Sequence, residues 1–349
     1  MIRRISRQVK VGNIKIGGDA PIAIQSMLNA LASDYEANLA QLKALEDAGC
    51  EIVRMAVPDM EAVKVLAKLK EQAKVPLVAD IHFDYKLALE SLEAGVDKIR
   101  INPGNIGSAE RIAAVADACA LKGVPIRIGV NSGSVEKDLL EKFGGATPEA
   151  MVESAFRHVK LLEDCGFYDT VISIKSSDVE NMVAAYSLVA ERCDYPLHLG
   201  VTEAGTERSS LVKSSVGIGA LLLKGIGDTL RVSITDSPVK EIYAARDILN
   251  AVNLRVETPR IVACPTCGRT KIDLVSLANQ VENAVKDIKK PVKIAVMGCV
   301  VNGPGEAREA DIGIAGGDGC AVLFKKGEIL RKVSEKDIVK ELLDELEKI

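Results

Sequence analysis

Three cysteines in the last third of the chain have the types and spacing of a metal-binding set. Cys264 and Cys267 flank a Pro-Thr pair, so one turn of backbone can present both thiols to one centre. Cys299 lies downstream, at the start of a glycine-rich segment that ends at Glu306. Both segments are rich in Pro and Gly, which favour tight turns whose N–H groups can point at sulfur. The spacing indicates three sides of a tetrahedral thiolate site.

The fourth ligand of such a site remains open on spacing alone. The only histidines are His82, His158 and His198, all upstream, which leaves no local site of three cysteines and one histidine. Cys320 would complete a site of four thiolates for zinc or iron–sulfur, and Glu306 would complete it with a carboxylate. Zinc ribbons usually carry a second Cys-x-x-Cys pair, which this sequence lacks. A structural zinc site and unrelated buried thiols are the alternatives.

The composition excludes several classes of protein. The 349 residues carry 45 Lys and Arg against 49 Asp and Glu, a net charge of −4, and no Trp, which disfavours nucleic-acid binding. No apolar run reaches the ~18 residues that span a bilayer, and the basic start lacks the apolar core of a signal peptide. Eight scattered cysteines are typical of cytosolic thiols plus a metal site. We expect a cytoplasmic protein that binds neither nucleic acid nor membrane.

Short β-type runs alternate with helical segments through most of the chain. Residues 9–18 alternate apolar and polar about a Gly-Asn turn, which predicts a hairpin. Segments such as Asp34–Ala48 and Met60–Gln72 carry apolar residues at three- and four-residue spacing, as helices do. Eight β/α units within about 250 residues predict an α/β fold, a (β/α)8 TIM barrel, with a doubly wound sheet as the alternative. The expected strands are Ile22–Met27, Ile52–Ala56, Leu77–Ile81, Lys98–Asn102, Ile126–Val130, Val171–Lys175, Leu197–Val201 and Thr229–Ile234.

One face of most predicted strands is polar and the other is apolar. Ile99 and Ile101, for example, alternate with Arg100 and Asn102, and successive strand residues face opposite sides of a sheet. The apolar face must pack on the surrounding helices, so the polar set points into the barrel and toward its C-terminal mouth. This set comprises Arg54, Asp80, His82, Arg100, Asn102, Arg127, Gly129, Asn131, Lys175, Ser177, His198, Gly200, Thr202, Arg231 and Ser233.

Four arginines and one lysine of this set would repel one another strongly inside one pocket. An arginine fork matches the oxygens of phosphate groups, so a diphosphate-bearing ligand is the natural counter-ion. The alternative is a set of strand-end ion pairs with Asp80 and Glu203. Because buried unpaired charge is rare, the number of these cations favours the phosphate pocket. His82 and His198, taken singly, are more often core histidines than catalysts.

A small second α/β domain is expected after the barrel. We expect the barrel domain at residues 1–252, a linker at 253–260 and the second domain at 261–349. A helix over Val239–Ala251 precedes the linker. The expected elements of the second domain are a helix at Leu274–Ile288, strands at Val292–Met297 and Ile312–Ala315, a hairpin across Val322–Ile329 and an amphipathic helix at Glu335–Ile349.

Several long motifs resemble one enzyme family. The runs ACPTCGR and GCVVNGPGEA are similar to the C-terminal signature of 4-hydroxy-3-methylbut-2-enyl diphosphate synthase, an enzyme of the methylerythritol phosphate route to isoprenoids. The resemblance extends over nearly the whole chain through PLVADIHFDY, RINPGNIG, RIGVNSGS, LHLGVTEAG and GIGDTLRVS. It implies a TIM barrel followed by a small, sulfite-reductase-like iron–sulfur domain. It also implies a [4Fe–4S] cluster held by Cys264, Cys267, Cys299 and Glu306.

The resemblance further implies a reaction, in which 2-C-methyl-D-erythritol 2,4-cyclodiphosphate is opened with two electrons from ferredoxin or flavodoxin, and water leaves. The expected diphosphate contacts are Arg100, Arg127, Lys175, Arg231 and Ser233. The other expected substrate contacts are Arg54, Asp80, His82, Asn102, Asn131, Thr202 and Asn302. Glu203 is the expected proton donor, and Glu306 is the cluster ligand that gives way to the substrate.

One stretch departs from the family pattern. The family commonly reads QSMTNT where this chain has Leu28 and Ala30, so neither position receives a ligand role.

Two other functions remain as alternatives. A zinc-dependent barrel methyltransferase would use the thiols but needs no ring of arginines. A non-catalytic iron–sulfur sensor would need the cluster but no phosphate pocket.

The topology of a barrel also predicts an assembly. Each barrel helix returns from the mouth to the floor, so the helix 239–251 ends near the floor and the linker 253–260 starts there. Eight extended residues reach at most ~26–29 Å, which a climb along the outer wall to the mouth would nearly exhaust. We expect a homodimer, as in the resembled family, in which the cluster of one chain serves the barrel of the other.

Overall fold

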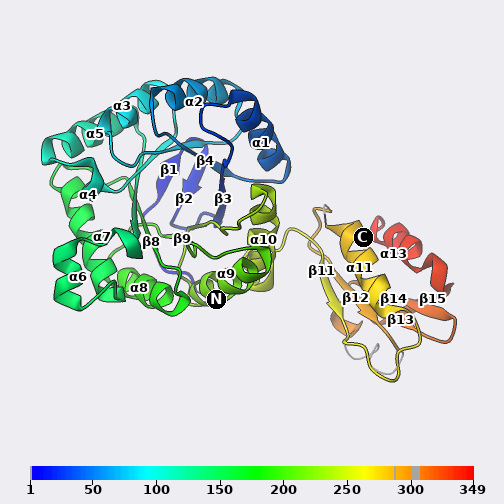
Figure 1. Cartoon of the computed structure of the whole chain (residues 1–349). Coiled ribbons are helices and arrows are strands. Elements are labelled where there is room, and N and C mark those ends of the chain that lie inside the picture. The colour runs from blue at the N-terminus through cyan, green and yellow to red at the C-terminus, as the bar shows by residue number, and fades with distance from the viewer. Residues whose placement is uncertain (1, 287, 300–306) are drawn as a thin grey trace. The chain divides into compact units, whose positions relative to one another are not determined.

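The computed structural model describes residues 2–286, 288–299 and 307–349, and the chain divides into two compact units, Met1–Leu254 and Arg255–Ile349. The first unit contains an eight-stranded parallel sheet in the order β8-β7-β6-β5-β4-β3-β10-β9. A parallel bridge between Ile172 and Leu197 joins its two end strands, and helices surround the sheet (Figure 1). This arrangement confirms the predicted (β/α)8 barrel.

Strands and helices alternate around the barrel. The strands are β3 (Ala23–Met27), β4 (Ile52–Ala56), β5 (Leu77–Asp80), β6 (Lys98–Ile101), β7 (Ile126–Asn131), β8 (Thr170–Lys175), β9 (His198–Leu199) and β10 (Thr229–Leu230). The helices are α1 (Tyr35–Asp47), α2 (Met60–Gln72), α3 (Tyr85–Glu93), α4 (Pro103–Ile106), α5 (Ala109–Lys122), α6 (Lys137–Phe143), α7 (Pro148–Glu163), α8 (Val179–Arg192), α9 (Glu207–Leu223) and α10 (Pro238–Ala251). Asp34, Asp59 and Asp178 each accept an N–H of the first helical turn, which stabilises the starts of α1, α2 and α8.

The last two barrel strands are shorter than the sequence predicts. The expected strands run on to Val201 and Ile234, whereas β9 and β10 end at Leu199 and Leu230. Beyond these points the backbone makes isolated hydrogen bonds, such as Arg231 N to Leu199 O at 3.0 Å. A ladder requires repeated pairing, so the chain leaves the sheet earlier here than its alternation of polar and apolar residues indicates.

A hairpin plugs the floor of the barrel. Its strands β1 (Val9–Val11) and β2 (Ile14–Ile16) pair antiparallel. Val11 and Ile16 form one buried cluster with three residues near the amino ends of β3, β4 and β5, which are Ala23, Ile52 and Val78. None of these five side chains is more than 2% exposed. The predicted hairpin is therefore present, and it seals the end of the barrel opposite the mouth.

The second unit contains a five-stranded sheet in the order β11-β12-β13-β14-β15. Its elements are β11 (Arg260–Ala263), α11 (Leu274–Val285), β12 (Lys293–Met297), β13 (Ile312–Gly316), β14 (Cys320–Lys325), β15 (Glu328–Ser334) and α13 (Ile338–Leu346). The first three strands are parallel, and the last two are antiparallel. Val281 of α11 and Leu342 of α13 pack in one core with Ile294 and Ile312 of the sheet. Strand β11 was not predicted, because its four residues follow the linker without a turn signal. None of the described helices is long and apolar enough to cross a lipid bilayer.

Candidate active site

The barrel interior brings together the cations predicted to share one pocket. Arg54, Arg100 and Arg127 lie on β4, β6 and β7, and each is at most 8% exposed. Lys175 ends β8 and is also buried. Lys98 lies two residues before Arg100 on the same inward face of β6 and is fully buried. Lys98 was not predicted as part of this set. Its position two residues before Arg100 was nevertheless a signal, because alternate residues of a strand face the same side.

Asp80 offsets part of this positive charge. Its Oδ1 accepts a hydrogen bond from Arg100 Nη1 at 2.9 Å, and Arg54 Nε lies 3.5 Å from its Oδ2. Burial acts to raise the pKa of Asp80, but the two guanidinium groups outweigh it and hold that pKa well below its usual range. Asp80 is therefore an ionised anchor between two arginines, so the ion-pair alternative applies to this part of the set.

Glu241 of α10 is a further buried carboxylate beside these cations and was not expected from the sequence. It is 2% exposed and accepts from Arg231 Nη2 at 2.9 Å and Nε at 3.0 Å. Ser26 Oγ and the Ile234 N–H donate to it at 2.7 and 3.1 Å. These four bonds satisfy the carboxylate and fix Arg231, which follows β10. The signal in the sequence was the position of Glu241 seven residues, or two helical turns, before Ile248, which places both on the buried face of α10.

Positive charge exceeds negative charge among the described residues inside the barrel. Arg127 Nε and Nη2 are buried without a hydrogen-bond partner in that set. Burial lowers the pKa of Lys175 well below its usual value, and Arg127 and Arg54 lower it further. Lys98 Nζ has a long hydrogen bond of 3.5 Å to Gln25 Oε1, and burial likewise lowers the pKa of Lys98. The interior is thus suited to a polyanion.

Two glycines make room for these cations. A Cβ atom at Gly129 would lie 2.5 Å from Arg100 Nε, and one at Gly200 would lie 2.9 Å from Lys175 Nζ and 2.8 Å from Arg231 O. Real Cβ atoms do not approach other atoms so closely. Glycine at these two positions lets long basic side chains lie across the neighbouring strands.

The other predicted contact residues lie at or just beyond the carboxyl ends of the strands. His82 is exposed, with its Nε2 3.4 Å from Arg100 Nη1. Asn102 is buried directly after β6, and Asn131 is the last residue of β7. Thr202 and Ser233 are half-buried and follow β9 and β10. In barrel enzymes this end of the strands carries the active site.

Two further titratable side chains of the predicted set have opposite environments. Glu203 is exposed, and its backbone is left-handed with φ of +49°, a conformation that costs about 1–3 kcal/mol in a non-glycine residue. His198 is fully buried, with its Nδ1 2.8 Å from Thr229 Oγ1. Burial, and then Arg127, lower the pKa of His198 well below its usual value. His198 is therefore a neutral core histidine.

Two of the predicted thiol ligands lie at one edge of the second sheet. Cys264 directly follows β11, and Cys299 lies two residues beyond β12. Because β11 and β12 are parallel neighbours, the two cysteines follow adjacent strand ends. The Gly298 N–H donates to Cys264 Sγ at 3.2 Å. An N–H group directed at sulfur stabilises negative charge on it.

The third thiol, Cys267, is exposed, and a hydrogen bond from the Arg269 backbone lowers its pKa. Within residues 2–286, 288–299 and 307–349, no three His, Cys, Asp or Glu side chains are grouped closely enough to hold a metal ion. The predicted residues Asn302 and Glu306 lie outside the described residues. Three thiols, two of them facing backbone donors, fit a thiolate-bound iron–sulfur or zinc centre by their chemistry.

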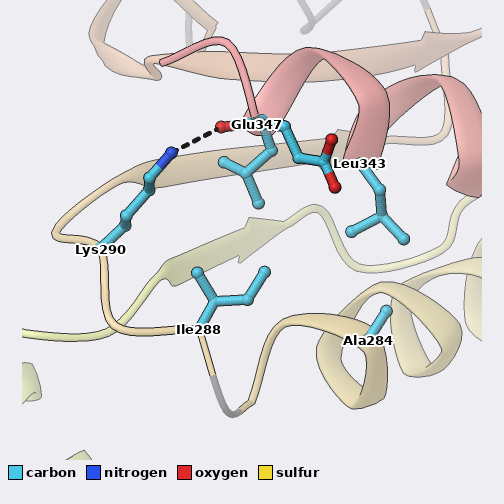
Figure 2. A pocket seen from close by; sticks show the side chains of 6 residues that line it. Ala284, Ile288, Lys290, Leu343 and Glu347 are labelled. Carbon is cyan, nitrogen blue, oxygen red and sulfur yellow. Dashed lines mark hydrogen bonds between the residues drawn. The ribbon is translucent and has the colours of Figure 1, made fainter.

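A separate hollow lies in the second unit, between the end of α11 and α13 (Figure 2). Its lining residues are Ala284, Ile288, Lys290, Leu343, Leu346 and Glu347. Lys290 Nζ donates to Leu346 O at 3.2 Å and closes one side. The lining is mainly aliphatic, so the barrel mouth and the cysteine edge are the better candidates for chemistry.

The fold and the two candidate sites define a barrel protein with a basic interior, followed by a second domain that carries several free cysteines. Residues 6–246 match the GcpE TIM-barrel domain, and residues 260–348 match the GcpE protein C-terminal domain. The chain belongs to the GcpE family.

Relatives of known name are similar over the full length. A protein of Caldanaerobacter subterraneus subsp. tengcongensis is 56% identical over 100% of this chain and 98% of its own length, and one of Clostridium perfringens is 55% identical over 100% of both. Each is named 4-hydroxy-3-methylbut-2-en-1-yl diphosphate synthase (flavodoxin). The structure of 3-dehydroquinate dehydratase from Geobacillus kaustophilus covers 72% of this chain and 98% of that chain, with 15% identity and a TM-score of 0.52. That likeness shows the barrel fold alone.

Replacing Lys98 by methionine should stabilise the barrel, increasingly so as the pH falls. The folded state holds the pKa of Lys98 below its ordinary value of 10.5. Between these two pKa values the unfolded chain binds more protons than the folded one, so wild-type stability falls as the pH falls. Methionine removes this linkage. Thermal unfolding from about pH 9 to about pH 6 should show a smaller loss in Lys98→Met than in the wild type. The exposed Lys64→Met is the control, and parallel profiles for Lys98→Met and the wild type would contradict the prediction.

Proposed function

We propose that this chain is a 4-hydroxy-3-methylbut-2-en-1-yl diphosphate synthase that takes its electrons from flavodoxin. The observation that carries this proposal is the identity of 55–56% over the whole chain with proteins of that name. The surplus of buried cations in the barrel agrees with a diphosphate substrate. A zinc-dependent methyltransferase would not need these cations, and neither would an iron–sulfur sensor. We also propose that the protein acts in the cytoplasm.

The proposed substrate is 2-C-methyl-D-erythritol 2,4-cyclodiphosphate. Two electrons and two protons open its ring at a C–O bond, one water leaves, and the product keeps the diphosphate. The proposed diphosphate contacts are Arg100, Arg127, Lys175, Arg231 and Ser233. The buried N–H groups of Arg127 without partners among the described residues support this role, because phosphate oxygens would satisfy them.

The residues around the mouth would orient the substrate and move protons. We assign Glu203 as the proton donor, because its exposed carboxylate stands on a strained backbone just beyond the carboxyl end of β9, and such strain clusters at active sites. Asp80 would stay ionised and hold Arg54 and Arg100 in place. The remaining proposed substrate contacts are Arg54, Asp80, His82, Asn102, Asn131, Thr202 and Asn302.

We propose that the second unit holds a [4Fe–4S] cluster through Cys264, Cys267, Cys299 and Glu306. The cluster, when bound, supplies electrons one at a time and an iron that can act as a Lewis acid. The backbone donors beside Cys264 and Cys267 support this assignment, since they stabilise negative charge on sulfur. A carboxylate is a harder and more easily displaced ligand than a thiolate, which is the role given to Glu306.

We further propose a homodimer in which each active site takes its barrel from one chain and its cluster from the other. Helix α10 follows the last barrel strand and so ends at the floor. The following eight residues, 253–260, span at most ~26–29 Å when extended. That reach leaves little chain for bringing the cysteines to the mouth of the same barrel.

The function is tested by anaerobic turnover of the cyclic diphosphate with a chemical reductant. The wild type should release the linear diphosphate, whereas Arg127→Met and Lys175→Met should bind the substrate more weakly by ~1.5–3 kcal/mol, the usual worth of a charge-assisted contact. Their visible spectra should match the wild type. No turnover by the wild type with an intact cluster would refute the proposed function. Undiminished binding in both variants would assign these two cations to structure.

Serine in place of Cys264, Cys267 or Cys299 should remove most bound iron and all activity, because each thiolate is a proposed ligand. Glu306→Gln should retain a damaged cluster. Cys320→Ser is the matched control, since Cys320 lies in the same unit, at the start of β14, and is not a proposed ligand. Iron content and the visible spectrum of anaerobically purified protein measure the outcome. Loss of iron in Cys320→Ser together with a normal Glu306→Gln would reverse the ligand assignment.

The shared active site predicts complementation between two inactive chains. Cys264→Ser lacks a working cluster and Arg127→Met lacks a working pocket. A heterodimer of the two contains one site in which both parts are wild type. Mixing the variants under conditions of measured subunit exchange should therefore restore part of the activity. An absence of rescue despite exchange would show that each chain completes its own site.

A further inference from the structure

We propose that Met27 is a positioning residue whose thioether holds the guanidinium groups of Arg54 and Arg231 as a pair for a ligand with two linked phosphates. The identity of that ligand as the cyclic diphosphate rests on the proposed function, whereas the pairing itself does not. Met27 is the last residue of β3 and is half-buried.

The topology places Met27 between the two arginines. Strand β3 lies between β10 and β4 in the sheet, and Met27 is directly paired with Arg54 in the parallel ladder. Arg231 directly follows β10 on the other side. Met27 Sδ lies 2.9 Å from Arg54 Nη2 and 3.2 Å from its Nε. The same sulfur lies 3.6 Å from Arg231 Nη1, so one atom contacts both guanidinium groups.

Each arginine is held on another side by a carboxylate. Asp80 lies beside Arg54, with 3.5 Å between Nε and Oδ2, and Glu241 accepts two hydrogen bonds from Arg231. The two negative charges therefore stand at the far sides of the pair, with the neutral sulfur between. Each guanidinium group is fixed by two contacts, which restricts the rotamers that it would otherwise sample.

The chemistry of sulfur explains why a thioether suits this place. A thioether is a weak acceptor without charge, so it receives N–H groups while leaving both positive charges for the ligand. A carboxylate here would neutralise the pair, and an aliphatic side chain would leave the N–H groups without an acceptor. Repulsion between the two cations accords with this picture, since burial, with Arg231 and Arg100 nearby, lowers the pKa of Arg54 to about 10.

The test compares three variants at Met27 with a control. Met55 is a buried methionine on the neighbouring strand β4 that packs in the apolar core, so Met55→Leu matches the packing change of Met27→Leu. The probe is inorganic pyrophosphate, and its Kd is measured by calorimetry on anaerobically purified holoenzyme. Met27→Leu should bind pyrophosphate roughly tenfold more weakly than Met55→Leu, as expected for a lost contact to a charged group. Met27→Gln, which supplies a neutral acceptor, should restore the Kd to within about threefold of the wild type.

Met27→Glu distinguishes a positioning role from a packing role. A carboxylate between the two arginines should raise the melting temperature and yet weaken pyrophosphate binding by more than tenfold, because it neutralises the pair. A packing residue would not move the two quantities in opposite directions. The proposal is overturned if Met27→Leu binds as tightly as Met55→Leu, or if Met27→Gln binds as weakly as Met27→Leu. Absent turnover of the cyclic diphosphate alongside the expected pyrophosphate results would refute the proposed function and leave the role of Met27 standing.

Discussion

Positive charge without a matching counter-charge inside the barrel is the constraint on which the rest of the site depends. Asp80 and Glu241 are tied to arginines, while Arg127 and Lys175 form no ion pair among the described residues. Bringing such groups out of water costs several kcal/mol each, which the apolar outer faces of the strands and their helices must offset. The glycines in β7 and after β9 admit the long side chains. The fold thus stabilises a barrel interior whose own electrostatics favour an anion.

In the second unit the charge to be stabilised is negative and lies on sulfur, whereas in the barrel the excess charge is positive. In both units the residues concerned lie on or just after parallel strands. At the carboxyl ends of β11 and β12, backbone N–H groups face the sulfurs of Cys264 and Cys267, where negative charge is to be stabilised. In the barrel, Arg54, Arg100, Arg127 and Lys175 bring guanidinium and ammonium groups into the interior from β4, β6, β7 and β8. Both sites stand where parallel strands end together, because neighbouring strand ends bring residues distant in sequence to one edge.

The inward-facing polar residues of the barrel strands were predictable, because successive side chains along a strand must point to opposite faces. Once Ile99 and Ile101 pack outward, Arg100 must point inward, and the structure buries it there. Glu241 was not predictable in this way, since its contact to Arg231 joins a helix to the end of a strand. The early ends of β9 and β10 depend on neighbouring strands and not on local sequence. Strand β11 has only four residues, too few for an alternation of polar and apolar side chains to be recognised in the sequence.

Among the described residues, the β1–β2 hairpin closes the floor of the barrel, which leaves the carboxyl ends of the strands as the way in for a ligand. Val11 and Ile16 close the amino ends of the strands with fully apolar contacts, so no charged molecule passes that way. Reactant and product must use the same opening, and both would carry a diphosphate. Release of one molecule therefore has to precede arrival of the next, and the two compete for the same cations. Charge that accelerates arrival also slows departure, which sets an upper limit on how strongly the barrel can hold its ligand and still turn over.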